Sequence, residues 1–242
     1  MNLTVDTGNS SVKAAVFHDG QAVAAYRGDG PSAEFFEAIL QQWPGIGAAI
    51  ISSTRNDNSE ELLAPHIKRL VRLGSETPVP LKNLYRTPAT LGYDRLAAAV
   101  GAWKTHEGRN IMMVDLGTAI TIDMVTARGE YLGGNISPGA ATRFRSLNEH
   151  TDRLPLLGLP ETEVPGSTGR DTAEAVEWGV VGGICFELEG YRRRLEGRYE
   201  DLLTVFTGGD AEYFAKRLKY PIFVVHNLVE VGLNTILEYN EP

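Results

Sequence analysis

Apolar and polar side chains alternate along two short runs near the N-terminus. Residues 3–5 and 11–17 are rich in β-branched and alternating apolar side chains, and the turn formers Asp, Thr, Gly, Asn and Ser occupy residues 6–10. This pattern predicts a strand, a tight turn and a second strand. After a turn at residues 18–20, a third alternating run covers residues 21–26. The chain is therefore expected to open with three consecutive strands.

Helical periodicity follows these strands. Pro31 and Ser32 open an amphipathic stretch in which Phe35, Phe36, Ile39 and Leu40 recur at helical spacing. A buried-looking strand is predicted at residues 48–52, and helical segments are predicted at 60–66 and 93–106. Together these elements predict a first α/β lobe, residues 1–108.

At residue 111 the pattern begins again. The run Met113–Thr118 echoes Thr4–Asn9, and Asp115 follows Asp6 by 109 residues. A strand at 120–125, a turn, a third strand from Glu130 and a helix at 139–147 then repeat the first succession of elements. One Val-Asp-x-Gly sequence would be an ordinary way to leave a strand, because Asp and Gly serve turns everywhere. Two copies that open the same succession favour an internal repeat.

The remaining sequence completes a second α/β lobe, predicted as residues 109–242. Helices are predicted at residues 172–195, 211–218 and 227–239, and a strand at 203–207. Within the first of these helices, Arg192 to Arg194 is typical of a solvated helix face.

Composition narrows the class of protein. The 43% apolar and 22% charged residues are those of an ordinary soluble protein, and no run approaches 18 uninterrupted apolar residues. The formal charge of −8 and the pI of about 5.2 disfavour nucleic acid as a partner. The single cysteine, Cys185, cannot form an internal disulfide. We expect a cytoplasmic protein with neither nucleic acid nor membrane as its partner.

Both hairpin turns carry groups suited to phosphate. Residues 6–10 supply a carboxylate, a glycine and side-chain donors, and Lys13 follows them, although Lys13 alone is also typical of a solvated strand residue. The second hairpin supplies Asp115, Gly117, Thr118 and Thr121. Carboxylates beside a phosphate require an intervening cation, and oxygen ligands suit Mg²⁺. Asp6 and Asp115 are therefore candidates for cation handling.

Other nucleotide and metal motifs have little support. The P-loop signature does not occur, and a dinucleotide fingerprint at residues 28–33 follows the third strand instead of the first, so it is interpreted as a loop and helix cap. The five histidines lack metal-ligand spacing. Residues 87–95 run from a loop into an apolar helix, where Asp94 alone would be read as a cap and Arg95 as solvated.

A set of motifs in a fixed order changes that interpretation. The sequence resembles type III pantothenate kinases, and the motifs that carry the resemblance are Asp6-x-Gly-Asn-Ser-x-x-Lys13, Gly92-Tyr-Asp-Arg95, Asp115-x-Gly-Thr-Ala-x-Thr121, Gly133-Gly-x-Ile-x-Pro-Gly139, Thr207-Gly-Gly-Asp210 and Asn227-Leu-x-x-x-Gly-Leu233. The resemblance implies an α/β fold with two ribonuclease H-like, actin-like lobes facing a nucleotide cleft. It also implies a homodimer that phosphorylates pantothenate with ATP, the first step towards coenzyme A, using Mg²⁺ and a monovalent cation, K⁺ or NH₄⁺.

The resemblance also assigns roles to residues. The phosphate loop for ATP would be Asp6, Thr7, Gly8, Asn9, Ser10, Ser11, Val12 and Lys13. Thr118 would contact ATP, and Asp115 would ligate the monovalent cation. Pantothenate would be held by Tyr85, Gly92, Tyr93, Asp94, Arg95 and Thr172. Ser10 stands where the family often has threonine, and the hydroxyl is retained.

The chemistry of phosphoryl transfer agrees with these roles. The reaction depends on positioning and charge neutralisation, and Asp94 would accept the proton of the attacking hydroxyl as the new bond forms. Arg95 would bind the pantothenate carboxylate through paired hydrogen bonds. Two alternatives remain: another small-molecule kinase or phosphatase of the same fold, and a regulatory protein that binds nucleotide without catalysis.

Overall fold

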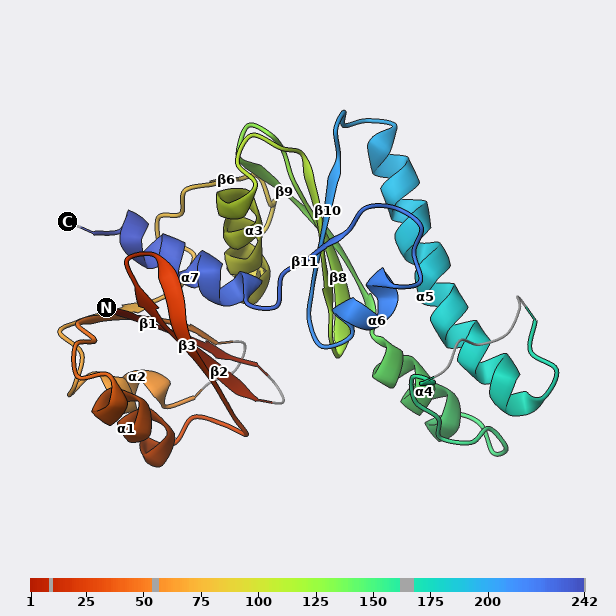
Figure 1. Cartoon of the computed structure of the whole chain (residues 1–242), viewed down its shortest axis with the longest axis horizontal. Helices are drawn as coiled ribbons and strands as arrows, with labels where there is room; N and C mark the ends of the chain where they lie inside the picture. The colour runs from red at the N-terminus through yellow and green to blue at the C-terminus, as the bar shows by residue number, and fades with distance from the viewer. Residues whose placement is uncertain (9–10, 54–56, 162–167, 242) are drawn as a thin grey trace. The chain divides into compact units, whose positions relative to one another are not determined.

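The structure is a computed structural model that describes residues 1–8, 11–53, 57–161 and 168–241. It is a mixed α/β protein with two β-sheets, one of five strands and one of six (Figure 1). The chain forms two compact units: the first comprises Met1–Gly108, Val125–Gly133 and Asn227–Pro242, and the second comprises Arg109–Met124 and Gly134–His226. The division into lobes 1–108 and 109–242 stays a prediction.

The first unit is built on the five-stranded sheet, whose order is β3-β2-β1-β4-β5. The strands are β1 (Asn2–Thr7), β2 (Val12–His18), β3 (Gln21–Gly28), β4 (Ala48–Ser53) and β5 (Arg69–Arg72). β2 pairs antiparallel with β1 and β3, whereas β4 is parallel to both β1 and β5. Strand β5 is short and charged at both ends, and the alternation of apolar residues did not predict it.

Five helical segments accompany this sheet. They are α1 (Ala33–Gln42), α2 (Ser59–Leu63), the 3₁₀ turn η1 (Pro88–Thr90), α3 (Tyr93–Thr105) and α7 (Leu228–Tyr239). The Ser32 hydroxyl accepts a hydrogen bond from the Phe35 backbone nitrogen at 3.2 Å, which caps α1 and confirms the interpretation of residues 28–33 as a loop and cap. Phe36 and Ile39 of α1 are buried against β1 and β2 side chains.

Helices α3 and α7 cross with their backbones in close contact. Both Gly101 in α3 and Gly232 in α7 lie at the crossing. A Cβ on Gly232 would lie 1.7 Å from the Ala97 carbonyl oxygen, and one on Gly101 would lie 2.2 Å from the Leu228 carbonyl oxygen. Such distances are impossible for carbon, so only glycine allows this packing.

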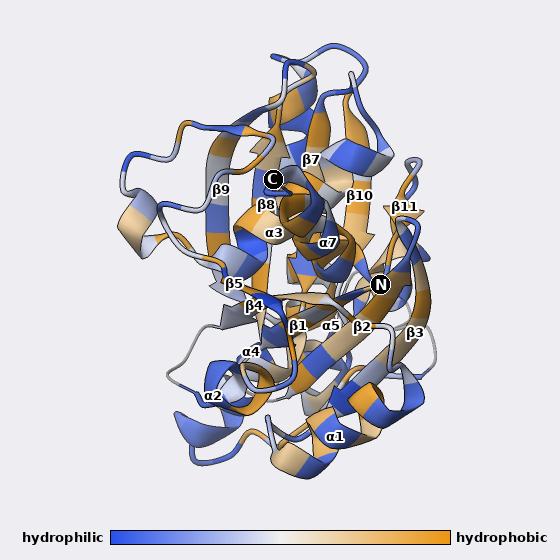
Figure 2. Cartoon of the chain, turned by 90° about the vertical axis from the view of Figure 1, so that its left-hand side faces the viewer, coloured by the Kyte–Doolittle hydropathy of each residue, from blue (hydrophilic) through white to orange (hydrophobic). Residues whose placement is uncertain are grey.

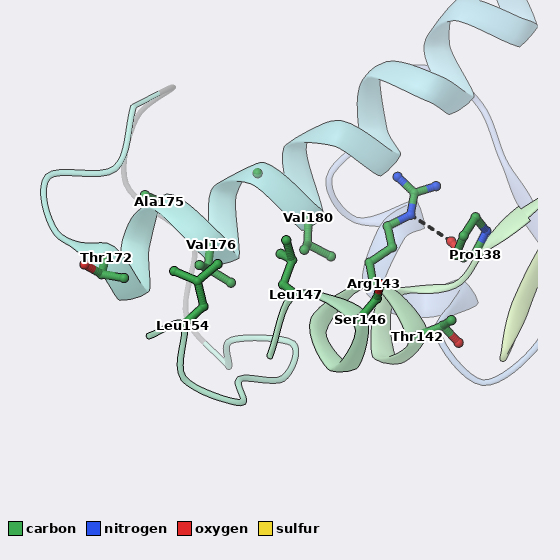
Figure 3. Close-up of a pocket in the computed structure, with 11 residues that line it drawn as sticks. Pro138, Thr142, Arg143, Ser146, Leu147, Leu154, Thr172, Ala175, Val176 and Val180 are labelled. Atoms are coloured by element: carbon green, nitrogen blue, oxygen red, sulfur yellow. Dashed lines mark hydrogen bonds between the residues drawn. The ribbon is translucent and has the colours of Figure 1, made fainter. Parts of the chain in front are cut away.

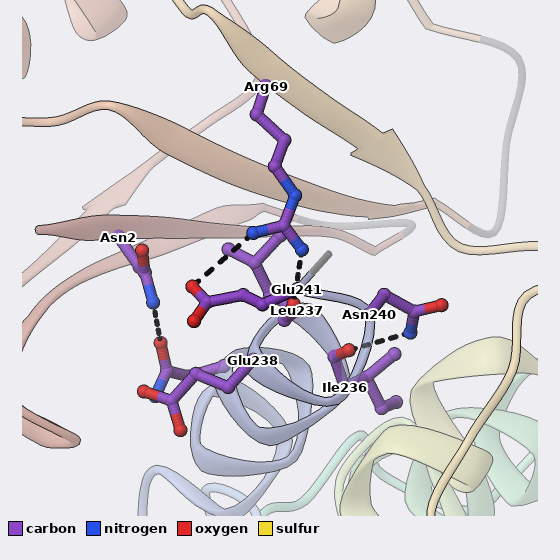
Figure 4. A network of polar contacts seen from close by, with 8 residues as sticks. Asn2, Arg69, Ile236, Leu237, Glu238, Asn240 and Glu241 are labelled. Atoms are coloured by element: carbon purple, nitrogen blue, oxygen red, sulfur yellow. Dashed lines mark hydrogen bonds and ion pairs between the residues drawn. The ribbon is translucent and has the colours of Figure 1, made fainter.

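Polar contacts tie the C-terminal helix to strands β1 and β5 of the first sheet (Figure 4). Asn2 donates to the Asn234 side chain at 2.9 Å, and Arg69 donates to the Leu237 carbonyl oxygen at 2.6 Å. Arg69 also forms an ion pair with Glu241 at 3.3 Å. Helix α7 is thus fixed by backbone packing on one helix and by side chains from β1 and β5.

The six-stranded sheet has the order β11-β10-β7-β8-β9-β6. Its strands are β6 (Lys82–Asn83), β7 (Ile111–Leu116), β8 (Ala119–Val125), β9 (Glu130–Pro138), β10 (Leu203–Thr207) and β11 (Phe223–Val224). The helices of the second unit are α4 (Ala140–Glu149), α5 (Thr172–Glu196) and α6 (Ala211–Ala215). Strand β10 and helix α7 are largely hydrophobic along their lengths (Figure 2).

The order of strands repeats in the two sheets. β3-β2-β1-β4 in the first corresponds to β9-β8-β7-β10 in the second, and the repeated aspartates lie in the corresponding strands β1 and β7. This shared topology supports the internal repeat that Asp6 and Asp115 indicated. The two-residue strands β6 and β11 were not predicted, because so few residues carry no periodic signal.

Several details differ from the sequence-based expectations. Helix α2 ends at Leu63, three residues before its predicted end at residue 66. Helix α6 ends at Ala215, three residues before its predicted end. Arg192 is not solvated: its side chain is 13% exposed, it donates to the Thr204 hydroxyl, and its guanidinium carbon lies 4.4 Å from the centroid of the Tyr220 ring. Arg192 lies on a side of helix α5 that faces neighbouring elements. The run of three arginines in the sequence gave no sign of this orientation. No helix within the described ranges is long and apolar enough to span a membrane.

The helix crossing leads to a first prediction. We expect Gly232→Ala to lower the free energy of unfolding by about 3 kcal/mol, because the added methyl group has no room beside Ala97. Gly190→Ala, in the exposed interior of α5 with open space around it, should instead stabilise by about 0.5–1 kcal/mol. Urea denaturation of both variants measures the difference, and a wild-type midpoint for Gly232→Ala would contradict the close crossing.

Candidate active site

The first hairpin brings a carboxylate and an ammonium group to paired positions. In the antiparallel register of β1 and β2, Asp6 lies opposite Lys13 and Thr7 lies opposite Val12. The Gly8 backbone nitrogen donates to the Ser11 carbonyl oxygen at 3.0 Å and closes the turn. The predicted ATP-binding residues Asn9 and Ser10 lie outside the described residues. The described part of the turn is compact and has small side chains, as a phosphate loop requires.

Asp6 is a buried acid in an unusual electrostatic environment. Its side chain is almost inaccessible, and its Oδ1 has no hydrogen-bond partner among the described residues. Burial raises the pKa of Asp6 to about 7, and the negative charges of Asp94 and Glu230 contribute, while Lys13 acts in the opposite direction. A cation bound beside Asp6 would favour its ionised form, so this position suits the chemistry of a metal-bound nucleotide.

Helix α3 carries the predicted acceptor of the substrate proton. Gly92 is the N-cap, and Asp94 lies in the first turn, where its carboxylate accepts a hydrogen bond from the Arg95 backbone nitrogen at 2.8 Å. A Cβ on Gly92 would lie 2.5 Å from Asp94 Oδ1, so glycine at this position leaves room for the carboxylate. The same charge influences Asp6, which places Asp94 near the first hairpin. The helix start therefore places an acid within electrostatic reach of the candidate phosphate loop.

Arg95 follows Asp94 and is buried, with 7% of its surface exposed. Its guanidinium carbon lies 5.7 Å from the centroid of the Tyr85 ring. The reading of Arg95 as solvated, drawn from the local segment alone, is therefore wrong. Helix α3 is buried over most of its length, and its first turn carries Arg95 inward with it. Tyr85 and Arg95, both predicted to bind substrate, lie together.

The second hairpin is approached closely by two other segments of the second unit. A Cβ on Gly139 would lie 1.9 Å from the Gly117 carbonyl oxygen. Gly208 has a φ of +92°, and a Cβ there would lie 2.4 Å from Asp115 Oδ1. Three motifs that are distant in the sequence thus converge on one turn, because their glycines permit backbone contact.

Hydrogen bonds stabilise the contact between these three motifs. The Gly139 nitrogen and the Thr142 hydroxyl both donate to the Thr118 carbonyl oxygen, at 3.0 and 2.7 Å, and the Asp210 nitrogen donates to the Leu116 carbonyl oxygen at 3.0 Å. Asp115 is half-buried beside them. A half-buried carboxylate is an oxygen ligand of the kind that a hard cation takes. No group of three or more His, Cys, Asp or Glu side chains suited to a metal occurs among the residues that the structure describes.

Thr172 lies at a different feature, a cavity of about 730 Å³ between α4 and α5 (Figure 3). Its lining is mostly apolar and includes Leu147, Val176 and Val180. At the other end, Arg143 donates to the Pro138 carbonyl oxygen at 2.7 Å. None of the other residues predicted to hold pantothenate lines this cavity.

One residue of the first site escaped the sequence-based prediction. Glu230, in the first turn of α7, is 6% exposed; burial raises its pKa and Lys13 lowers it. The sequence did contain a sign that Glu230 belongs to the site, because Glu230 is an isolated acid among apolar residues of the Asn227–Leu233 motif. An acid in that position is seldom buried unless a partner compensates it.

Known proteins are similar to this chain in sequence and in fold. The chain is 41% identical over 244 residues to a type III pantothenate kinase of Phocaeicola vulgatus, covering 100% of this chain and 99% of the relative. Among solved structures, it resembles a candidate Baf family transcriptional activator from Campylobacter jejuni, with a TM-score of 0.64, 22% identity and 98% of each chain covered. It also resembles a candidate 2-dehydro-3-deoxygalactonokinase from Sinorhizobium meliloti, with a TM-score of 0.64, 14% identity and complete coverage of both chains.

These structural likenesses show the fold, which is that of the actin-like ATPases and sugar kinases. The model of the family described as type III pantothenate kinase matches residues 2–194. The chain belongs to the type III pantothenate kinase family.

Proposed function

We propose that this protein transfers the γ-phosphoryl group of ATP to pantothenate, forming 4′-phosphopantothenate in the first step of coenzyme A biosynthesis. Membership of the family supports this reaction. The observation that carries it is the placement of Asp94, at the start of α3, close enough to the Asp6 hairpin to influence the ionisation of Asp6. A carboxylate beside a phosphate loop is the arrangement that phosphoryl transfer to an alcohol needs.

ATP would be bound by the turn of the first hairpin, from Asp6 to Lys13, and by Thr118. Lys13, which lies opposite Asp6, would offset the charge of the phosphates. Thr118 is exposed at the second hairpin, and its carbonyl group is already engaged, so its side chain is the part available to a nucleotide.

Pantothenate would be held by Tyr85, by the Gly92–Arg95 segment and by Thr172. Asp94 would accept the proton of the substrate hydroxyl as the bond to phosphorus forms. The Arg95 guanidinium would bind the substrate carboxylate through two parallel hydrogen bonds. Its burial supports this role, because a desolvated guanidinium binds a carboxylate more strongly.

Two kinds of cation would assist the reaction. Mg²⁺ would accompany ATP and offset phosphate charge, and a monovalent cation, K⁺ or NH₄⁺, would bind at Asp115. The half-buried carboxylate of Asp115, an oxygen ligand, supports this proposal.

We also propose a cytoplasmic homodimer. The apolar cavity between α4 and α5 and the exposed Leu156 and Phe186, 63% and 61% accessible, support an apolar interface on the second unit. The single cysteine and the absence of long apolar runs support a reducing, aqueous compartment.

The direct test is ADP release by the purified protein with ATP, Mg²⁺ and pantothenate in potassium buffer. A panel of other small alcohols tests the acceptor. No turnover of pantothenate, or faster turnover of another alcohol, would contradict the proposed reaction.

Replacement of the proposed proton acceptor gives a second prediction. We expect Asp94→Asn to lower kcat by about 100-fold or more, since the amide cannot accept the proton, and to leave ATP affinity nearly unchanged. Asp19→Asn, which makes the same change at a side chain that is 90% exposed, is the matched control and should retain wild-type kcat. Near-normal turnover of Asp94→Asn would remove Asp94 from the mechanism.

The raised pKa of Asp6 gives a third prediction. In the ligand-free protein, stability should fall as pH rises from about 4 to about 7, because the folded state binds a proton that the unfolded state has released. Asp6→Asn removes this dependence. Between pH 4 and pH 8, the free energy of unfolding of the wild type should therefore fall by roughly 2–4 kcal/mol relative to that of Asp6→Asn. Urea unfolding at the two pH values measures the difference, and parallel pH profiles of the two proteins would contradict the burial of an ionisable Asp6.

The cation proposed at Asp115 gives a fourth prediction. We expect Asp115→Asn to raise the K⁺ concentration needed for half-maximal activity by about tenfold or more, because a neutral amide is a weaker ligand than a carboxylate. Titration of activity with KCl at constant ionic strength measures this shift. An unchanged K⁺ dependence would exclude Asp115 as the ligand.

A further inference from the structure

Strand β6 fixes the position of Tyr85. Lys82 and Asn83 pair with Glu130 and Tyr131 of β9 in parallel register. The Leu84 nitrogen donates to the Tyr131 carbonyl oxygen at 2.9 Å, and the Tyr85 nitrogen then donates to the Asn83 side chain at 2.9 Å. These bonds extend the contact with β9 beyond the strand and turn the chain at Tyr85.

The ring of Tyr85 lies against two residues of β9. The Tyr131 ring is fully buried, and its centroid is 6.4 Å from that of Tyr85 at an interplanar angle of 32°. Two residues later, Gly133 has a φ of +85°, and a Cβ there would lie 2.6 Å from Tyr85 Cδ2 and 3.0 Å from Cε2. The Tyr85 ring therefore occupies the space that any other residue at 133 would fill.

The other neighbour of the ring is Arg95. Its guanidinium carbon is 5.7 Å from the Tyr85 centroid, within the range of a cation–π contact. Arg95 projects from the first turn of α3, next to the proposed proton acceptor Asp94. A planar guanidinium binds a carboxylate in paired geometry only when its orientation is fixed.

We infer that Gly133 is a positioning residue for substrate specificity: its missing side chain lets the Tyr85 ring pack on β9 and orient the Arg95 guanidinium towards a carboxylate-bearing substrate. This inference rests on the proposed function and extends it to a residue that touches neither substrate. The glycine acts through the ring, so a side chain at position 133 should weaken recognition of the carboxylate and leave ATP binding unaffected.

The test compares Gly133→Ala with wild type on pantothenate and on pantothenol, which has an alcohol in place of the carboxylate. We expect the KM for pantothenate to rise about tenfold, while the inhibition constant of pantothenol and the KM for ATP stay within about twofold of wild type. Equal losses for both compounds, or no loss for either, would overturn the inference.

Gly108→Ala is the matched control. Gly108 has a φ of +78°, and a Cβ there would meet nothing within 4 Å, so this variant carries the same backbone strain without the steric clash. It should keep the wild-type ratio of the two constants. Should Gly133→Ala fail to fold, Gly133→Asn adds a Cβ while tolerating positive φ better, and the same comparison applies. Wild-type protein that does not phosphorylate pantothenate would overturn the proposed function itself, whereas active wild type with an unchanged Gly133 variant would overturn only this inference.

Discussion

The crossing of α3 and α7 at two glycines is the constraint on which the first site depends. Gly101 and Gly232 let the two helix backbones touch, so the first turn of α7 lies close to α3 and to β1. As a result Asp94 from α3 and Glu230 from α7 both act on Asp6 in β1. Three segments that are far apart in the sequence thereby share one electrostatic environment, and the C-terminal helix becomes part of the site.

The environment of Asp6 lowers the stability of the protein when no ligand is bound. Asp6 is buried, its Oδ1 has no partner in the described part of the chain, and two other acids repel its charge. Burying an uncompensated carboxylate costs free energy, and protonation is the usual response. A metal-bound nucleotide would reverse this balance, since positive charge beside Asp6 stabilises the ionised form. Under the proposed function, the lower stability of the ligand-free state would be offset by affinity towards a cation-bearing ligand.

The sequence predicted the elements that have a strong period and missed those that depend on tertiary contacts. The hairpins at Asp6 and Asp115 and the long helix α5 were found because alternation and helical spacing are local. Arg95 and Arg192 were read as solvated, since a charged side chain gives no sign of which neighbours will enclose it. The burial of Glu230 likewise follows from the α3–α7 crossing, which no local pattern in α7 contains.

The backbone contacts made by the glycines of the motifs could not be predicted from local patterns either. In the sequence, Gly139 opens a predicted helix and Gly208 belongs to the Thr207–Asp210 motif, and Gly208 has positive φ in the structure. In the structure they are points where one backbone touches another, and both touch the turn of the second hairpin. The two hairpins share a strand order, yet their aspartates differ in setting: Asp6 is enclosed by side chains and other acids, whereas Asp115 is half-buried among backbone groups. The repeat therefore supplies the same order of strands twice, and the packing around each aspartate gives the two carboxylates different environments.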